Sequence, residues 1–247
     1  MSIFKKTKEP VKRKEFLITD GKMDFNITEA FRNFKATLSV SIPKKANGEG
    51  IVVMFTSANP GEGKTTVAVN LALMCAISDT RVILVDADVR KGRVGRYFKK
   101  KSVPGLTDCL AGQKTLEEVT YHDTTNGNFS YITRGTRSPR PYELLESEEM
   151  RKLLQQLKKE YDYVIIDTPP VPALSDALAL ASQVDGTVVV CRHRHTNVGE
   201  IAKTLNTLNY AKANVLGVVV NDYKVESFNK FNKYNEYYKQ LEEDKGE

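Results

Sequence analysis

The sequence has no tryptophan and little cysteine, with Cys75, Cys109 and Cys191 as its three thiols. Because these cysteines are odd in number, scattered and embedded in apolar segments, they support neither a disulfide framework nor a metal site. We therefore expect all three to be buried free thiols.

Long apolar runs are also missing. No stretch approaches the ~20 apolar residues that a membrane-spanning helix needs, and no signal-peptide-like apolar segment follows the N-terminal methionine. These absences predict a cytoplasmic protein. The length of 247 residues suits one α/β domain with a well-filled core and does not by itself require a second domain.

Acidic residues are too few to balance the basic ones, so the formal net charge is +6. The basic excess lies in two clusters, Lys5, Lys6, Lys8, Lys12, Arg13 and Lys14, and then Arg90, Lys91, Arg93, Arg96, Lys99, Lys100 and Lys101. Such clusters can contact nucleic acid, anionic lipid or an acidic partner, and they are often solvated surface, which is an even alternative for the N-terminal cluster. Charge alone suggests a nucleic-acid-binding module, and we do not expect nucleic acid as a partner.

The most informative stretch runs from Ile51 to Thr66. Five apolar residues, Ile51–Phe55, predict a buried strand of a parallel sheet, and a turn rich in glycine and proline leads to Gly63-Lys64-Thr65. A helix-compatible apolar segment follows from Val67 to Ala76. This order of strand, loop and helix is the setting of a phosphate-binding loop, and it disfavours the alternative of a chance Gly-Lys-Thr in a turn.

In such a loop, glycines let backbone N–H groups approach phosphate oxygens, and the helix N-terminus adds partial positive charge. Lys64 is expected to reach the β- and γ-phosphates of ATP, and the Thr65 hydroxyl is expected to hold Mg²⁺. Ala58 stands where the usual pattern has its first glycine, a small departure because alanine tolerates most conformations with negative φ. The residues predicted to bind ATP here are Pro60, Gly61, Glu62, Gly63, Lys64, Thr65 and Thr66.

Two more predicted strands end in acidic residues. Arg81–Val85 leads into Asp86-Ala87-Asp88-Val89-Arg90, and Tyr163–Ile166 leads into Asp167. In open parallel sheets ligands bind at the carboxyl ends of the strands, so we expect these acids to face the same phosphates as Lys64. Single aspartates at strand ends are often helix caps, whereas a paired Asp-x-Asp after a phosphate-binding loop is more specific. Asp167 has the position and chemistry of an acid that contacts Mg²⁺.

The remaining segments predict an alternating β/α order. A capping-box-like start at Asn26 and Glu29 opens a helix over residues 26–40, and another helix is expected over Glu143–Tyr161. Further elements are expected at Gly105–Leu110, Thr115–Val119, Phe129–Thr133, Thr187–Cys191, Val198–Ala211 and Val215–Val220. The fold class is therefore α/β, a mostly parallel sheet with helices on both faces, as in the three-layer P-loop NTPases.

Three parts of the chain are expected. Residues 1–25 have the composition of a flexible basic arm, residues 26–222 form the α/β domain, and residues 223–247 form a flexible tail rich in tyrosine, lysine, asparagine and glutamate. Asn221, at the end of the last predicted strand, can recognise an adenine edge and is therefore included in the ATP site, although asparagine is equally typical of a turn.

Three motifs resemble those of the bacterial protein-tyrosine kinases of capsular and exopolysaccharide synthesis. They are the phosphate-binding loop over Ala58–Thr66, VILVDADVR at 82–90 and VIIDTPP at 164–170, which resemble Walker motifs A, A′ and B. RPYELLESEEM at 140–150, Leu174-Ser175-Asp176 and the tyrosine-bearing C-terminus extend the resemblance over nearly the whole chain from about Asn26. The resemblance implies a kinase that uses ATP and Mg²⁺ to phosphorylate tyrosines in its own tail and regulates polysaccharide synthesis and export.

Matching positions imply a role for each residue of the site. Thr65, Asp88 and Asp167 would organise Mg²⁺, while Lys64 would bind the phosphates. Asp86 would be the base that orients or deprotonates the attacking phenol, because a phenol with a pKa of about 10 is a poor nucleophile at neutral pH. Arg90 would hold the incoming substrate or the nucleotide. The implied catalytic residues are Asp86, Lys64, Asp88 and Arg90.

The resemblance also implies how the tail is used. The expected phosphoacceptors are Tyr234, Tyr237 and Tyr238, with Tyr223 as a weaker candidate. In this family the tail enters the neighbouring subunit of a ring built through an ExxRxxR helix, which this chain matches with Glu29, Arg32 and, in the last place, Lys35. Lysine keeps the charge and loses the bidentate fork of arginine, so we expect a weaker or differently balanced ring.

The implied partners are a membrane adaptor of the polysaccharide chain-length regulator type, a cognate tyrosine phosphatase and other cytoplasmic protein substrates. The cytoplasmic tail of the adaptor would activate the kinase and hold it at the inner face of the membrane, where the basic arm could add contacts with anionic lipid. The alternative is a ParA/MinD-like ATPase switch, which shares all three motifs. Those ATPases carry a signature lysine in a KGGxGK loop where this chain has Asn59-Pro60-Gly61, so the kinase is favoured.

Overall fold

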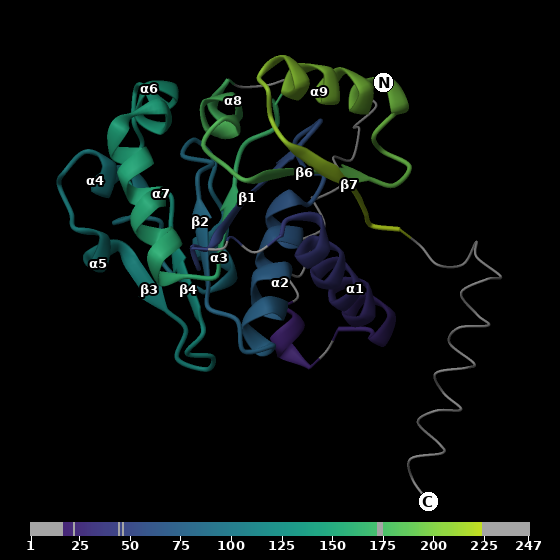
Figure 1. The fold of residues 1–247 in the computed structure, drawn as a ribbon, viewed down its shortest axis with the longest axis horizontal. Helices are drawn as coiled ribbons and strands as arrows, with labels where there is room; N and C mark the ends of the chain where they lie inside the picture. The colour runs from purple at the N-terminus through teal and green to yellow at the C-terminus, as the bar shows by residue number, and fades with distance from the viewer. Residues whose placement is uncertain (1–16, 22, 44, 46, 172–174, 224–247) are drawn as a thin grey trace, which may run out of the picture.

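The computed structural model describes residues 17–21, 23–43, 45, 47–171 and 175–223. They form a seven-stranded sheet flanked by helices (Figure 1). The strands are β1 (Ile51–Ser57), β2 (Val82–Asp86), β3 (Thr120–His122), β4 (Phe129–Ile132), β5 (Tyr163–Asp167), β6 (Gly186–Arg192) and β7 (Val215–Asn221). The helices are η1 (Ile18–Asp20), α1 (Phe25–Ser41), α2 (Lys64–Ile77), α3 (Val94–Tyr97), α4 (Leu106–Leu110), α5 (Leu116–Val119), α6 (Pro141–Glu146), α7 (Glu148–Glu160), α8 (Asp176–Ala181) and α9 (Val198–Tyr210).

The strand order is β3-β4-β2-β5-β1-β6-β7, and every neighbouring pair is parallel except β3 and β4. Strands β1, β2 and β5 are largely Val, Ile, Leu, Met and Phe, and all their residues are buried, as in central strands covered on both faces. Because these strands are parallel, the loops that follow them all leave from one edge of the sheet. The predicted fold class is confirmed.

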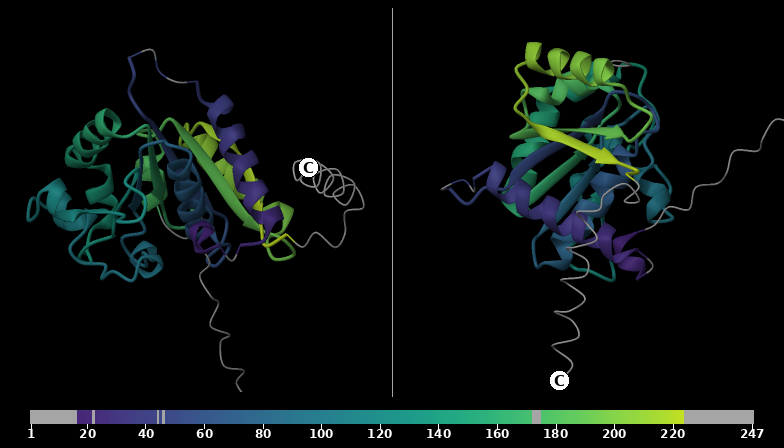
Figure 2. Two further views of the ribbon diagram at one scale, coloured as in Figure 1. Left: turned by 90° about the horizontal axis from the view of Figure 1, so that it is seen from below. Right: turned by 90° about the vertical axis from the view of Figure 1, so that its right-hand side faces the viewer.

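Helices α1 and α2 lie side by side against one face of the sheet (Figures 1 and 2). Leu71 and Leu73 of α2 are buried in the same core cluster as Phe55 and Ile165 of the strands, and Leu38 of α1 joins it. This packing fixes the direction in which α2 leaves the phosphate-binding loop.

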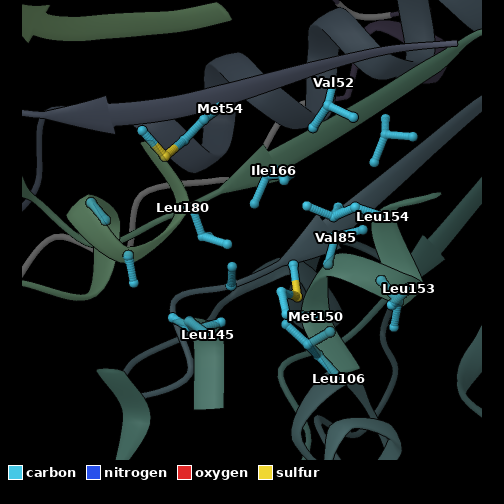
Figure 3. Packing of buried hydrophobic residues seen from close by; sticks show 14 of the residues in the cluster. Val52, Met54, Val85, Leu106, Leu145, Met150, Leu153, Leu154, Ile166 and Leu180 are labelled. Carbon is cyan, nitrogen blue, oxygen red and sulfur yellow. The ribbon is translucent and has the colours of Figure 1, made fainter. Parts of the chain in front are cut away.

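Helices α6 to α9 cover the opposite face. Figure 3 shows the packing at its centre, where Leu153 and Leu154 of α7 lie with Val85 and Ile166 of the central strands. Both faces of the sheet are therefore buried, which explains why the central strands are continuously apolar rather than alternating.

Two helix boundaries differ from the sequence-based expectation. The N-cap of α1 is Asp24, whose carboxylate accepts a hydrogen bond from the backbone N–H of Asn26 at 2.8 Å, so the predicted cap at Asn26 is wrong. The single helix predicted over Glu143–Tyr161 is wrong as well. Ser147 is extended there, with ψ of 161°, and caps α7 by accepting from Met150 N–H at 3.2 Å, so α6 and α7 are separate. At both places a local side-chain cap sets where the helix begins, and at Ser147 it also divides the predicted helix in two.

The folded domain begins earlier in the chain than predicted. Within the expected arm over residues 1–25, η1 is folded, and Ile18 N–H donates to Asn70 Oδ1 of α2 at 2.8 Å. Leu17 and Ile18 pack against the core on the α2 side of the sheet. Residues 17–20 therefore belong to the domain, while residues 1–16 lie outside the described part of the chain.

The three cysteines are free thiols, as predicted. Cys75 and Cys191 are buried, whereas Cys109 is half-buried. Burial raises the pKa of Cys75 to about 11, so its thiol stays protonated near neutral pH. Within the described ranges, no helix combines the length and the apolar character that crossing a membrane would require.

Candidate active site

The phosphate-binding loop joins the end of β1 at Ser57 to the start of α2 at Lys64. Gly61 and Gly63 have φ angles of 84° and 88°, in the left-handed region that residues with a Cβ rarely adopt. Gly63 is the N-cap of α2, so the free N–H groups of the first helical turn lie at the loop. This backbone arrangement is suited to binding phosphate oxygens.

Lys64 lies between two carboxylates at the mouth of the loop. Its Nζ is 3.1 Å from Asp167 Oδ1 and 3.5 Å from Asp88 Oδ2, and Lys64 is 8% exposed. Burial alone would lower the pKa of Lys64, but the charges of Asp167 and Asp88 outweigh it and raise that pKa, so the ammonium group stays charged. The Thr65 hydroxyl donates to Asp167 Oδ2 at 2.6 Å. The structure thus brings four of the predicted residues into one group, here called the Lys64 cluster.

Asp86 adjoins this cluster from the next strand. It ends β2 directly opposite Asp167, the last residue of β5, and is 1% exposed. Its Oδ2 accepts from Val94 N–H at 3.0 Å, while its buried Oδ1 has no hydrogen-bond partner among the described residues. Burial and the neighbouring charge of Asp167 raise the pKa of Asp86 well above the usual range. A buried carboxyl group that is only half satisfied is typical of a functional site.

The loop after β2 folds closely over Asp86. A Cβ added to Gly92 would lie 2.5 Å from Asp86 Oδ2, so this position has no room for a side chain. Arg90 lies in the same loop and forms a two-pronged ion pair with Asp176, its Nε and Nη2 at 2.6 and 3.0 Å from the two carboxylate oxygens. Asp176 is fully buried, at 0% exposure, and begins α8. It therefore fixes the orientation of the Arg90 guanidinium group.

A second set of contacts holds the loop from the β6 and β7 side. The Asn221 side-chain amide donates to the backbone oxygen of Glu62 at 2.9 Å. The buried Glu62 carboxylate accepts from Asn59 N–H at 3.0 Å and also from the hydroxyl of Thr196. Asn221 therefore helps to position the loop, and Thr196 does so too through its hydrogen bond to Glu62. The sequence analysis did not identify Thr196. The only signal for Thr196 was its place beside Asn197, which caps α9.

The other predicted residues fall into separate groups. Within the loop, Pro60 is exposed and the hydroxyl of Thr66 is hydrogen-bonded to that of Tyr97 at 2.7 Å. Glu29 and Arg32 are ion-paired with each other on α1, and Lys35 of the same helix lies near Cys75, toward the opposite end of α2 from Lys64. The predicted acceptors Tyr234, Tyr237 and Tyr238 lie outside the described residues.

The donor set fits a nucleotide with Mg²⁺. Thr65, Asp88 and Asp167 offer hydroxyl and carboxylate oxygens, the ligands that Mg²⁺ prefers, and the orphaned Asp86 Oδ1 adds an acceptor beside them. In the described part of the chain, no three or more His, Cys, Asp and Glu side chains could enclose a metal on their own. Mg²⁺ usually takes one or two protein carboxylates and completes its coordination with phosphate and water, so this set suffices.

Replacing Gly63 with alanine is expected to weaken ATP binding by about fivefold to thirtyfold, because a left-handed alanine costs roughly 1–2 kcal/mol. The new Cβ would also lie 2.0 Å from Asn221 Nδ2. Isothermal titration calorimetry with ATP and Mg²⁺ measures the affinity.

The double variant Gly63→Ala/Asn221→Ala removes this clash but keeps the backbone strain. Gly112→Ala is the matched control, because Gly112 has a φ of 70° with no atom within 4 Å of the added Cβ. We expect Gly112→Ala to lower stability and leave ATP affinity unchanged. Unaltered affinity in Gly63→Ala would contradict the assignment of this loop to phosphate binding.

Comparison with known proteins adds a sequence relationship to this geometry. The AAA domain family matches residues 50–218. The putative tyrosine-protein kinase EpsB of Ralstonia solanacearum is 36% identical over 210 residues, covering 85% of this chain and 28% of EpsB. The tyrosine-protein kinase YwqD of Bacillus subtilis is 36% identical over 178 residues, covering 72% of this chain and 75% of YwqD.

Solved structures agree with the sequence comparison. The kinase domain of the Escherichia coli tyrosine kinase ETK is similar with a TM-score of 0.73 and 34% identity, covering 80% of this chain and 77% of that domain. The septum site-determining protein MinD of Pyrococcus horikoshii has a TM-score of 0.60 at 22% identity, which shows a shared fold alone. The chain spans 28% of the length of EpsB, so the similarity covers one part of that protein.

Proposed function

The chain belongs to the bacterial tyrosine-protein kinases, and we propose that it transfers the γ-phosphoryl group of ATP to tyrosines, first of all those of its own C-terminal tail. The observation that carries this proposal is the position of Lys64 Nζ between Asp88 and Asp167, with Asp86 on the neighbouring strand. Phosphoryl transfer depends on positioning and on charge stabilisation at the phosphates, and this group of one cation and three carboxylates can provide both.

Each side chain has a distinct part in the proposed reaction. The N–H groups at Gly63 and the first turn of α2 hold the phosphates, and Lys64 exchanges its two carboxylate partners for the β- and γ-phosphate oxygens. Thr65, Asp88 and Asp167 would hold Mg²⁺, which would neutralise phosphate charge when bound.

Asp86 receives the proton of the attacking tyrosine. As the phenolic oxygen forms its bond to the γ-phosphorus, the bond from that phosphorus to the bridging oxygen of ADP breaks, and the phenolic proton passes to Asp86. The raised pKa of Asp86 makes it a better proton acceptor than an ordinary aspartate. Its free Oδ1 is the atom available for this transfer.

Replacing Tyr234, Tyr237 and Tyr238 together with phenylalanine is expected to remove most phosphotyrosine while leaving ATP binding unchanged. The assay incubates the chain with radiolabelled ATP and Mg²⁺, measures protein label and free phosphate in the same samples, and maps the sites by mass spectrometry. Tyr210→Phe is the matched control, because Tyr210 is 88% exposed on α9 and is not a predicted acceptor.

In this assay a kinase labels the wild-type chain on tyrosine. Release of phosphate with no phosphotyrosine, even with a tyrosine peptide added, would favour the ParA/MinD-like ATPase and contradict the proposed kinase activity. Full labelling of the triple variant would leave the kinase standing and refute the assignment of the tail acceptors.

Self-association through α1 is part of the proposal. The helix exposes Phe25 at 45% and Ile27 at 47% beside the Glu29–Arg32 ion pair, a mixture of apolar and charged side chains suited to a subunit contact. We expect Arg32→Glu to weaken assembly at least about tenfold. The substitution replaces the cation that pairs with Glu29 by a second acidic group, so acidic side chains would repel each other at the proposed contact. Sedimentation velocity measures the assembly.

The matched control for Arg32→Glu is Arg151→Glu. Arg151 forms the same kind of exposed pair with Glu148, three residues earlier on α7, so the substitution makes an equal change of charge elsewhere. Equal assembly by the two variants would contradict a contact through α1.

In the cell, the proposed kinase acts in the cytoplasm at the inner face of the membrane. A membrane adaptor with an activating cytoplasmic tail recruits it, a tyrosine phosphatase reverses the modification, and polysaccharide synthesis and export are the regulated process. The family resemblance of the three nucleotide-site motifs supports these assignments.

A further inference from the structure

A basic cavity lies beside the proposed catalytic carboxylate and has no part in the mechanism above. Its volume is about 190 Å³. This cavity, here called the basic cavity, is lined by Arg90, Lys91, Gly92, Arg93, Arg96, Arg134 and Arg137. Apart from Gly92, every lining residue carries a positive charge, so the cavity is built for an anion.

The charges of this cavity are largely uncompensated. Among the described residues, Arg90 is the one lining residue with a carboxylate within ion-pair distance, namely Asp176. Arg134 is half-buried, and its Nη1 is buried without a hydrogen-bond partner in the described structure. Because this nitrogen is closed to solvent, the exposed guanidinium groups of Arg93, Arg96 and Arg137 are the ones available to an anion in the cavity.

The topology places the basic cavity on the far side of Asp86 from the nucleotide. Asp86 ends β2, and the sheet order β4-β2-β5-β1 puts the phosphate-binding loop after β1 on one side of it. Arg134 follows β4 on the other side. A tyrosine that approaches Asp86 in line with the nucleotide therefore has this cavity beside it, where neighbouring residues of the same peptide would lie.

The size of the cavity and the charge of its lining favour a compact anion. Its about 190 Å³ would hold roughly six waters at about 30 Å³ each, enough for one phosphate group with bound solvent. A phosphate monoester brings a charge of about −1.5 to −2 and three acceptor oxygens, which arginine forks bind well. A nucleic-acid backbone would instead require cations spread along an open track.

We propose that the basic cavity binds the phosphate of a tyrosine that is already phosphorylated, a few residues from the tyrosine whose phenol lies at Asp86. This inference rests on the proposed kinase function and extends it to substrate choice. Tyr234 and Tyr237 are three residues apart in the sequence, and Tyr238 follows directly. Three extended residues span about 10 Å, which is enough to cross the one strand spacing of about 4.8 Å that separates β2 from its neighbour β4. One phosphorylation of the cluster thus promotes the next.

The test uses the full chain with its three tail tyrosines changed to phenylalanine, so that its own tail is not modified during the measurement. The probe is a fluorescent peptide of residues 230–241 in two forms, unmodified and phosphorylated at Tyr234. Fluorescence anisotropy without nucleotide gives the two affinities. We expect the phosphorylated form to bind at least about tenfold more tightly.

The matched variants separate this cavity from general surface charge. Arg93 and Arg137 are both exposed at its rim. The double variant Arg93→Gln/Arg137→Gln should lose the preference for the phosphorylated peptide and keep its affinity for the unmodified one. Arg151→Gln, on α7, should keep the preference. With ATP and Mg²⁺ present, phosphorylation of the peptide at Tyr234 should lower KM for the remaining tyrosines by a similar factor with little change in kcat.

Equal binding of the two peptides would overturn the inference, as would a preference that survives the double variant. Competition by duplex DNA as strong as that by the phosphopeptide, lost in the same variant, would assign the cavity to nucleic acid and overturn it too. Because binding is measured without nucleotide, failure of phosphoryl transfer with a retained preference would count against the proposed kinase and leave phosphate binding in the cavity supported.

Discussion

Replacing Lys64 with methionine is expected to lower the rate of phosphotyrosine formation by about 10²–10³, the loss typical of removing one preorganised donor from a transition state. Methionine has a similar length but no charge. It can therefore neither stabilise the charge of the phosphates nor neutralise the carboxylates of Asp88 and Asp167. Protein label from radiolabelled ATP, measured on the full chain with a tyrosine peptide present, gives the rate.

The same substitution should also weaken the fold. Lys64 Nζ neutralises Asp88 and Asp167 at 3.5 and 3.1 Å, and removing one partner of a buried ion pair costs about 3–5 kcal/mol. Lys114→Met is the control, since Lys114 pairs with Glu118 on the surface and should lose little of either property. A Lys64→Met variant that remains folded by circular dichroism and labels at a normal rate would refute the role of the Lys64 cluster.

Replacing Asp86 with asparagine should separate activity from stability. We expect kcat to fall by about 10²–10⁴, because the amide can accept no proton from the phenol. The ligand-free chain should nevertheless become more stable by about 1 kcal/mol or more, since the amide removes a buried charge that repels Asp167. The amide oxygen can still accept the hydrogen bond from Val94 N–H. Thermal unfolding and steady-state phosphorylation of one tyrosine peptide measure the two effects.

The stability gain should depend on pH with a definite sign. The folded-state pKa of Asp86 is raised, so above about pH 4 the folded chain binds more protons at this group than the unfolded chain does. Raising the pH through this window therefore lowers the free energy of unfolding of the wild type. The Asp86→Asn variant lacks this contribution, so its advantage should grow from acid toward neutral pH. An advantage that shrinks with rising pH would contradict the pKa assignment.

The parts of the site that follow one another in the sequence could be predicted from it. Lys64 and Thr65 lie where a contiguous loop between a strand and a helix ends. Asp86 and Asp167 each follow a short apolar run, a pattern that predicts a central strand. Parallel pairing then places those ends together, as the register Asp86 to Asp167 shows. Local pattern and one rule of sheet topology were sufficient.

The supporting contacts could not be predicted in this way. Arg90 meets Asp176 across 86 residues, and Thr196 meets Glu62 across 134. Neither pair shares a periodicity or a motif, because tertiary folding alone brings them together. Arg134 likewise joins the basic cluster after β2 only because β4 pairs with β2. From the sequence alone, that cluster could be solvated surface. The structure shows that several of its residues line a cavity.

The most direct test of the central claim is a crystal structure of the full chain with Mg²⁺ and a non-hydrolysable ATP analogue. The proposed mechanism predicts Lys64 Nζ on the phosphates, the metal held from Thr65 and the carboxylates of Asp88 and Asp167, and Asp86 open toward the γ-phosphate. A nucleotide bound away from Lys64, or carboxylates of Asp86, Asp88 and Asp167 turned away from the γ-phosphate, would contradict it.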